Sequence, residues 1–266
     1  MYIPRNPFFA EFSYGYALTE DLIIGQGMQL TIAPVFPSLI EEGQVGFDVL
    51  LERNGIPVFL QFKLAHVMVR RTAFEVRDGF FDPPFYRMHL RCREEMNQHS
   101  LLIALESAGN EVFYAAPSFH LREQLDEAYR LRQVWQRSFQ IKPSDIGTLS
   151  QEDHHVSFQK PGTWRVFSAD STRAGESGNS KTVSDKLAAN IREKRVPKIR
   201  DQLHEIDASM LKIFKERKDE SASWRPVSTD EIETQLTPLS RISYLARSFF
   251  DCQFFVATEK PNPLGP

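Results

Sequence analysis

The stretch GFDVLLERNGIPVFLQFKLA, residues 46–65, is the part of the sequence that decides the predicted fold. It contains two apolar runs, 47–52 and 58–64, on either side of Asn54-Gly55. Asn-Gly is the strongest two-residue hairpin signal, because both turn positions need a positive φ. We therefore predict two antiparallel strands that are joined at Asn54-Gly55.

The polar residues of this hairpin fall on one face. With Asn54-Gly55 as the loop, Asp48 lies directly opposite Gln61. Lys63 is two residues further along the same strand, so its side chain emerges on the same face. Counting from the turn, Asp48 and Gln61 form a non-hydrogen-bonded pair with Cα atoms about 4.5 Å apart. The hairpin thus predicts three polar side chains together on otherwise apolar strands.

The sequence around the hairpin predicts an α/β (α+β) core. Apolar residues recur at helical spacing in 9–24, and residues 28–38 indicate a short strand followed by a loop. After the hairpin, the predicted elements are a helix over 86–99, a buried strand over 101–105, a strand over 112–116, and a helix over 119–139 with Ser118 as its candidate N-cap.

Composition and periodicity suggest four regions along the chain. They are a core over 1–140, short strands over 141–167 that complete or flank it, a linker rich in Ser and Gly over 168–182, and a mainly helical C-terminal region over 183–266. Two short strands are expected within 156–167, and a helix interrupted by Pro197 over 183–218. The C-terminal region offers a surface for a homodimer or another protein partner.

Asp48, Gln61 and Lys63 are the candidates for chemistry. Hard cations such as Mg²⁺ take oxygen ligands, which a carboxylate and an amide carbonyl supply. A neighbouring lysine can place a metal-activated hydroxide or stabilise charge on a phosphate. The alternative is that the three residues form the solvated face of a hairpin, where a lysine beside an aspartate contributes little. Polar side chains on a strand as apolar as 58–64 require partners, which favours a site.

The pattern Asp48, twelve residues, Gln61-x-Lys63 across an antiparallel hairpin resembles the active site of the PD-(D/E)XK nuclease superfamily, which has the restriction-endonuclease-like fold. The likeness covers residues 8–120, and the predicted order of elements is similar to that family's αβββαβ core. Gln61 replaces the commoner acidic residue, as in the Q-x-K variant that is typical of Mrr-type restriction enzymes. The exchange removes one negative charge from the site.

The resemblance implies roles for individual residues. Asp48 and Gln61 would bind Mg²⁺ or Mn²⁺, and Lys63 would orient the attacking hydroxide or neutralise the transition state. An acidic residue of the first helix often completes such a metal site. Glu11 is preferred for this role, and Glu20 and Glu42 are the alternatives.

The function that the resemblance implies is metal-dependent phosphodiester hydrolysis of DNA, in bacterial phage defence or restriction. The first alternative is a catalytically inactive protein of the same fold that acts as a nucleic-acid-binding or scaffolding module, which the exchange to Gln61 favours. The second is an interaction protein with an unrelated α+β fold.

Two basic stretches are candidates for contacts with the phosphate backbone. One is the arginine-rich segment 70–93, and the other is 186–200, which has six basic residues and one acidic residue. Both can instead be solvated faces, since charge runs are weak signals. The candidate contact residues are Arg70, Arg71, Arg77, Lys186, Arg192, Lys194 and Arg195. DNA is the expected partner, with RNA left open.

The overall composition excludes several classes of protein. The chain has 266 residues, of which 41% are hydrophobic and 25% are charged, as in an ordinary globular protein. Its net charge of −3 argues against a protein that coats nucleic acid by charge alone. Cys92 and Cys252 have no metal-ligand spacing, and the N-terminus does not have the pattern of a signal peptide. A cytoplasmic protein without a membrane span is the expectation.

Overall fold

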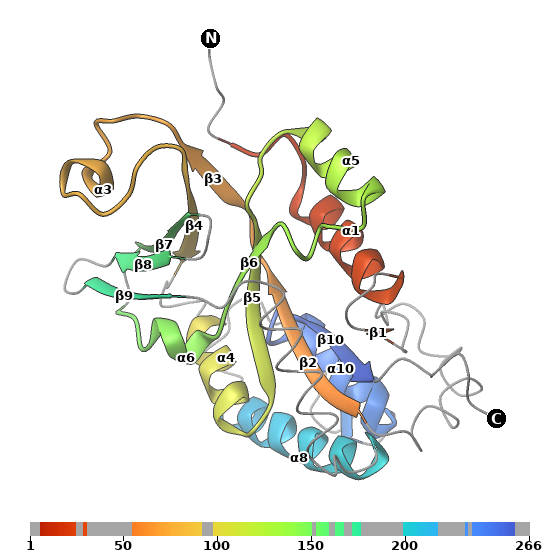
Figure 1. Ribbon diagram of the computed structural model, residues 1–266. Coiled ribbons are helices and arrows are strands. Elements are labelled where there is room, and N and C mark those ends of the chain that lie inside the picture. The colour runs from red at the N-terminus through yellow and green to blue at the C-terminus, as the bar shows by residue number, and fades with distance from the viewer. Residues whose placement is uncertain are drawn as a thin grey trace. The chain divides into compact units, whose positions relative to one another are not determined.

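The computed structural model describes residues 6–24, 29–30, 55–91, 98–150, 153–159, 163–167, 172–176, 199–217, 232–233 and 236–258 (Figure 1). The described part is a mixed α and β structure with two five-stranded sheets. The chain divides into two compact units, and each is described by itself. The first unit comprises Met1–Asp21, Phe62–Arg93 and Tyr114–Val183, and the second comprises Leu22–Gln61, Glu94–Phe113 and Ser184–Pro266. Within the described ranges, no helix is long and apolar enough to cross a bilayer.

An antiparallel sheet with the strand order β3-β4-β7-β8-β9 is the main element of the first unit. The strands are β3 (Ala65–Met68), β4 (Phe85–Arg91), β7 (Asp153–Gln159), β8 (Thr163–Phe167) and β9 (Thr172–Glu176). The register pairs Met88 with Val156 and Val156 with Val166, so one face of the sheet is apolar and buried. The opposite face carries polar side chains, which are His66, Arg87, His89, His155, Ser157 and Arg165.

The apolar face of this sheet packs on β6 (Ser138–Ile141). The rings of Phe158 and Phe139 stack with centroids 4.2 Å apart. β6 pairs antiparallel with the last residues of β5 (Glu111–Pro117), which begins in the second unit. Each buried phenylalanine of this kind contributes roughly 1.5–3 kcal/mol to folding.

Helix α1 (Glu11–Ile24) confirms the helix predicted over 9–24. Tyr14 on its inner face is fully buried, and its hydroxyl donates to Oγ of Ser138 at 2.8 Å. Burial raises the pKa of Tyr14, so the hydroxyl remains a donor. A Cβ atom at Gly15 would lie 2.6 Å from the ring of Phe62, so only glycine permits this approach of the helix.

The second unit has the strand order β1-β10-β2-β5. β10 (Gln253–Thr258) lies antiparallel to both β1 (Gln29–Leu30) and β2 (Gly55–Phe62). The described helices of this unit pack on one another and on the sheet, with α10 against α8 and β10 and with α4 against α8 (Figure 1). These helices are α4 (Gln98–Ser107), α8 (Ile199–Arg217) and α10 (Pro238–Ser248).

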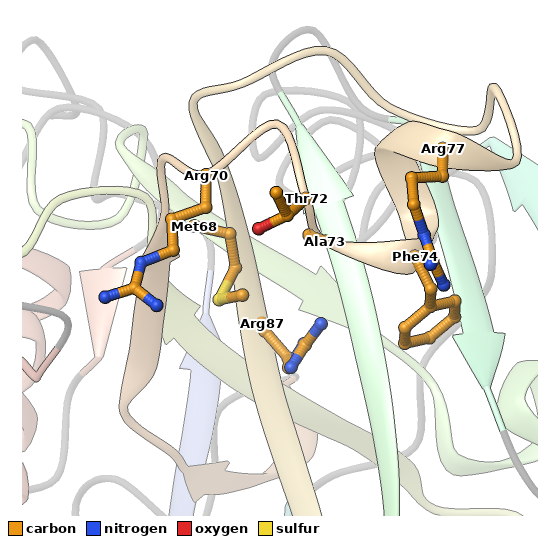
Figure 2. Close-up of a pocket in the computed structure, with 7 residues that line it drawn as sticks. All are labelled: Met68, Arg70, Thr72, Ala73, Phe74, Arg77 and Arg87. Carbon is orange, nitrogen blue, oxygen red and sulfur yellow. The ribbon is translucent and has the colours of Figure 1, made fainter.

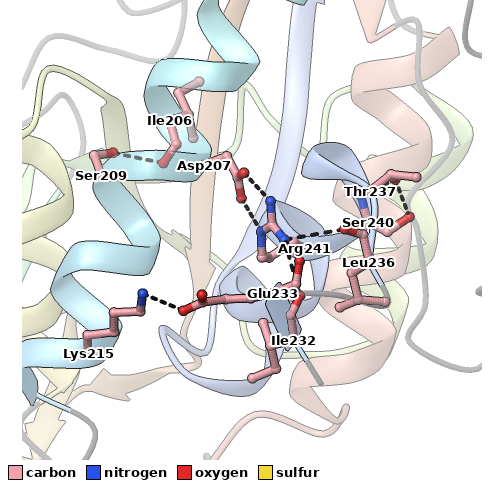
Figure 3. A network of polar contacts seen from close by, with 10 residues as sticks. All are labelled: Ile206, Asp207, Ser209, Lys215, Ile232, Glu233, Leu236, Thr237, Ser240 and Arg241. Atoms are coloured by element: carbon pink, nitrogen blue, oxygen red, sulfur yellow. Dashed lines mark hydrogen bonds and ion pairs between the residues drawn. The ribbon is translucent and has the colours of Figure 1, made fainter. Parts of the chain in front are cut away.

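Arg241 of α10 forms hydrogen bonds with α8 and with residues 232, 233 and 236 (Figure 3). Its Nε donates to Oδ1 of Asp207 on α8 at 2.7 Å, and its Nη2 donates to Oδ2 at 2.5 Å. Its Nη1 donates to the carbonyl oxygens of Ile232, Glu233 and Leu236 at 3.2, 2.9 and 3.3 Å. A planar guanidinium with five donors suits this combination of one carboxylate and three carbonyls.

Two predicted elements have the opposite secondary structure. The helix predicted over 86–99 is wrong, because β4 occupies Phe85–Arg91. Tyr86, Met88 and Leu90 lie on one face of this strand, and the residues between them lie on the other. The strand predicted over 101–105 is also wrong. This run lies in α4, where Leu101 and Leu105 are buried one helical turn apart. An apolar run of five residues fits either structure, and packing decides between them.

The helix predicted over 119–139 is shorter in the structure. It is α5 (Arg122–Arg130), and Ser118 does not cap it. The side chain of Gln124 accepts instead from the backbone N–H groups of His120 and Leu121, both at 3.0 Å. Arg132 has a φ of 54°, which is incompatible with a continuing helix.

Other predictions agree with the described elements. β5 matches the strand predicted over 112–116, β7 and β8 match the two strands predicted within 156–167, and α8 follows Pro197 as expected. Five residues of the stretch 168–182, which composition suggests is a linker, form β9 and pair with β8. Residues 183–198 and the predicted strand 47–52 lie outside the described residues.

Candidate functional site

β2 begins earlier than the strand predicted over 58–64, because Gly55 already pairs with Thr258 of β10 as its first residue. Asn54, the other predicted turn residue, lies outside the described residues. β2 has β10 and β5 as its neighbours in the described sheet. Both edges of β2 are thus occupied in the described sheet, so the predicted pairing of Asp48 with Gln61 in a two-stranded hairpin is contradicted. Asp48 itself lies outside the described residues.

Gln61 is buried, with 1% of its surface exposed, and its amide lies in a polar cluster of the second unit. Its Oε1, the predicted metal ligand, accepts from Nε2 of Gln98 at 2.7 Å. The same Gln98 nitrogen lies 2.7 Å from Oδ2 of Asp251, and Nε2 of Gln61 lies 3.4 Å from that oxygen. The sequence analysis identified Gln61 but missed both Gln98 and Asp251. An amide oxygen and a carboxylate that meet in this way suit a hard cation.

The other members of the predicted catalytic set belong to the first unit. Lys63 follows β2, and its backbone N–H donates to the carbonyl oxygen of Ala115 at 2.9 Å. Glu11 is exposed in the first turn of α1, where the helix dipole favours a carboxylate. The alternative Glu20 accepts hydrogen bonds from Tyr129 and from Arg132, which lower its pKa.

Glu42, the third acidic candidate for a metal ligand, lies outside the described residues. Among the residues that the structure does describe, no three His, Cys, Asp or Glu side chains gather as a group that could hold a metal ion.

An open pocket of the first unit gathers arginines from three places in the chain (Figure 2). It has a volume of about 350 Å³. Arg70 follows β3, Arg77 is the last residue of α3 (Phe74–Arg77), and Arg87 lies in β4. The remaining lining residues are Met68, Thr72, Ala73 and Phe74. We call this set of seven residues the arginine pocket.

Glu75, on α3, holds Arg87 in place. It is fully buried, and its Oε1 accepts from Nε and Nη2 of Arg87 at 3.0 and 2.5 Å and from Oγ of Ser157 at 3.0 Å. Nε2 of His155 lies 3.4 Å from the same oxygen. Burial alone would raise the pKa of Glu75, but His155 and Arg87 together lower it to about 2. Glu75 is therefore ionised under all ordinary conditions and fixes the guanidinium of Arg87.

Aromatic rings attach the loop that carries Arg70 and Arg77 to the polar face of the sheet. Phe74 packs edge-on against Phe167 at 5.0 Å, and Phe81 stacks on Phe85 at 5.3 Å. Nε2 of Gln159 donates to the carbonyl oxygens of residues 82 and 84 at 2.6 and 3.1 Å. The pocket is thus built on an ordered segment.

The structure brings together only part of the predicted nucleic-acid surface. Arg70 and Arg77 share the pocket, whereas Arg71 is exposed and does not line it. Lys186, Arg192, Lys194 and Arg195 lie outside the described residues. Arg87 belongs to the predicted arginine-rich segment 70–93 but was not among the candidate contact residues, and its pairing with Glu75 was not predicted. Their pairing joins α3 to β4, and no local pattern signals it.

Comparison with protein family models, with curated proteins and with solved structures finds no match for this chain. Proposals about its function therefore rest on the geometry of these side chains.

Proposed function

We propose that the protein binds nucleic acid and that the arginine pocket holds a phosphate of the backbone. The observation that supports this most strongly is that Arg70, Arg77 and Arg87, from three places in the chain, all line one open pocket. A guanidinium is always charged, and its fork of N–H donors matches two phosphate oxygens. Contacts to phosphate oxygens and sugars, to which arginine contributes, account for roughly half to two-thirds of the hydrogen bonds between proteins and DNA.

The charge balance at the pocket supports an anionic ligand. Glu75 neutralises Arg87, but neither Arg70 nor Arg77 forms an ion pair with a residue in the described ranges. Asp78 and Asp82, the nearest acidic residues after Arg77, are exposed. An anion in the pocket would therefore meet two uncompensated positive charges and one that is held in a fixed position.

An exposed aromatic ring near the pocket favours a single-stranded stretch of DNA. Phe80 follows Arg77 by three residues and is 38% exposed. The guanidinium of Arg165 lies 4.0 Å from the centroid of its ring. Arg165 thus covers one face of the ring, and a base that stacks on this Arg165–Phe80 pair must be unpaired, a contact that contributes about 1–3 kcal/mol. Phosphate and base would then be held by neighbouring groups.

Fluorescence anisotropy with a labelled DNA single strand tests the proposal. The double variant R70A/R77A should lower the affinity about tenfold or more, because both uncompensated charges are lost. The slope of log K against log salt should fall by about 1.4, since each lost contact with a single strand removes about 0.7. Duplex DNA and single-stranded RNA of the same length identify the preferred polymer.

The matched control is R122A/R130A, which removes the same charge from exposed positions on α5 of the same unit. It should keep the affinity and the salt slope of the wild type. An equal loss in both double variants would show that only the total charge matters. The absence of wild-type binding at low salt would overturn the proposal.

Metal-dependent hydrolysis of DNA is the second candidate function, with a restriction-endonuclease-like core as its proposed fold. The observation that favours it is the burial of Gln61, with its amide beside the Asp251 carboxylate. The element order α1, β1, β2, then α4 and β5, supports that core, whereas β3 and β4 pair in a separate sheet. A bacterial defence or restriction role belongs to this candidate.

In the second candidate, Asp48 and Gln61 of the second unit are the proposed ligands of Mg²⁺ or Mn²⁺, and Lys63, two residues after Gln61 in the chain, assists the attacking hydroxide. Lys63→Ala should leave the fold intact and reduce cleavage by orders of magnitude, and Asp48→Ala should abolish metal-dependent cleavage. Cleavage of labelled DNA, followed on a gel with each metal, measures both. Equal cleavage by the wild type and these variants would show that Lys63 and Asp48 do not have these catalytic roles.

A further inference from the structure

Four oxygen atoms of the second unit surround one nitrogen atom, Nε2 of Gln98. The two nearest are Oε1 of Gln61 and Oδ2 of Asp251, both at 2.7 Å. The other two are the backbone oxygens of Asp251 at 3.4 Å and Phe250 at 3.5 Å. They come from the end of β2 and from the connection between α10 and β10.

This arrangement has more acceptors than the amide can satisfy. An amide NH₂ group carries two hydrogens, so two of the four oxygens receive at best a weak contact. Asp251 also forms no ion pair with a described residue, so its carboxylate brings a negative charge to the cluster without a cationic partner from those ranges. The Gln98 nitrogen therefore lies where a positive charge would be favoured.

The backbone at Asp251 explains how one residue supplies two of the oxygens. Its φ is 49°, a left-handed value that is uncommon for a residue with a side chain. In this conformation both its carbonyl oxygen and its carboxylate lie within 3.5 Å of the Gln98 nitrogen. Gln61, by contrast, is fixed within a buried strand, so one side of the cluster is rigid.

We propose that these four oxygens form a binding site for a divalent cation and that the Gln98 amide takes the place of the ion in its absence. Binding would move Nε2 of Gln98 away, and rotation of the amide can supply Oε1 as a fifth ligand. Ca²⁺ binds oxygen at 2.3–2.6 Å, so the two side-chain oxygens would move in slightly and the backbone oxygens of Asp251 and Phe250 would move in by about 1 Å. Ca²⁺ suits unequal ligands and backbone carbonyls better than Mg²⁺, which demands a regular octahedron. The site is independent of the arginine pocket and goes beyond nucleic-acid binding.

Isothermal titration calorimetry of the full chain with CaCl₂ and with MgCl₂ tests this site. The wild type should bind Ca²⁺ with a dissociation constant of roughly 0.1–1 mM, the range of sites with few charged ligands. Asp251→Asn should weaken binding at least tenfold. Asp201→Asn, which removes an exposed aspartate from the first turn of α8 in the same unit, should leave it unchanged.

Gln98→Glu gives the sharper test, because it replaces the amide with a second carboxylate. Without a cation, this carboxylate faces Asp251 and the Gln61 oxygen, so the melting temperature should fall. CaCl₂ should restore it, and KCl at equal ionic strength should not. If this variant does not fold, Gln98→Ala exposes the same four oxygens without added charge and should still bind Ca²⁺, whereas Asp251→Asn should not.

The results that overturn the site are equally definite. They are an absence of Ca²⁺ and Mg²⁺ binding by the wild type, or binding that Asp251→Asn leaves unchanged. Loss of DNA binding in R70A/R77A with normal cation binding would support the arginine pocket separately. The two proposals therefore fail or succeed independently.

Discussion

Glu75 is the acidic residue on which the geometry of the arginine pocket depends. A buried carboxylate is unfavourable unless charged or polar donors compensate for its lost hydration. Here Arg87, Ser157 and His155 all face one of its oxygens, while the other oxygen, Oε2, is buried without a described partner. The network keeps Arg87 at the pocket at the cost of one incompletely satisfied atom.

The pKa of Glu75 predicts how stability depends on pH. Its value in the folded protein is about 2, below the ordinary value near 4.3. Its contribution to stability is therefore complete above about pH 5 and is lost as the pH falls toward 2. Glu75→Gln should lower the free energy of unfolding at pH 7 and flatten its decline between pH 5 and pH 2. Urea unfolding followed by circular dichroism at several pH values measures both effects.

The control for this experiment is Glu123→Gln, which removes the same charge from an exposed position in the first turn of α5. It should change the stability at pH 7 by less than about 0.5 kcal/mol. If Glu75→Gln behaved like this control, the carboxylate would not organise the pocket.

Sequence reasoning at the residue scale succeeded where one strand contained the information. Gln61 was singled out because the predicted hairpin placed it opposite Asp48 on an apolar strand, and the structure buries it among polar partners from other segments. Asp251 and Gln98 were missed because they reach Gln61 only through the fold. Asp251 is separated from it by 190 positions, and no periodicity links positions so far apart.

At the scale of elements, the sequence identified those with a marked period or a clear boundary. Helix α1 and strands β5, β7 and β8 were predicted in the right places. The segments 86–91 and 101–105 were exchanged between helix and strand, because short apolar runs fit either structure. Their identity follows from partners in the fold, since β4 lies between β3 and β7.

Arg241 predicts the strength of the connection between α8 and α10. The side chains of Arg241 and Asp207 are only 11% and 10% exposed, so the removal of one leaves the other buried without its partner. Arg241→Ala should reduce the free energy of unfolding by about 3 kcal/mol. Urea unfolding measures the loss, and hydrogen exchange should show faster exchange in α8 and α10.

The matched control for Arg241 is Lys215, whose ion pair with Glu233 lies nearer to solvent. Lys215→Ala should cost between about 0 and 1 kcal/mol, the usual range for a surface pair. An equal loss of unfolding free energy in the two variants would mean that the two hydrogen bonds from Arg241 to Asp207 contribute no more than an exposed ion pair.

At the scale of the whole molecule, the net charge of −3 and the arginine pocket act in opposite directions. The net negative charge of the chain repels a phosphate backbone, whereas the arginine pocket attracts it. Affinity should therefore depend on a small number of contacts and should fall less steeply with salt than for a uniformly basic protein. Composition gives only this average charge, whereas the fold shows which arginines share a surface.

Removal of metal ions distinguishes the two candidate functions in the intact protein. Guanidinium groups bind phosphate without a cation, so the wild type should bind a DNA single strand equally well in EDTA and in CaCl₂ at matched ionic strength, as measured by anisotropy. Asp251→Asn should bind DNA like the wild type, because Asp251 lies outside the arginine pocket. A loss of affinity in EDTA that Ca²⁺ or Mg²⁺ restores would contradict a metal-independent pocket. Metal-dependent cleavage that Lys63→Ala abolishes would instead establish the hydrolase, since a protein that only binds leaves the strand intact.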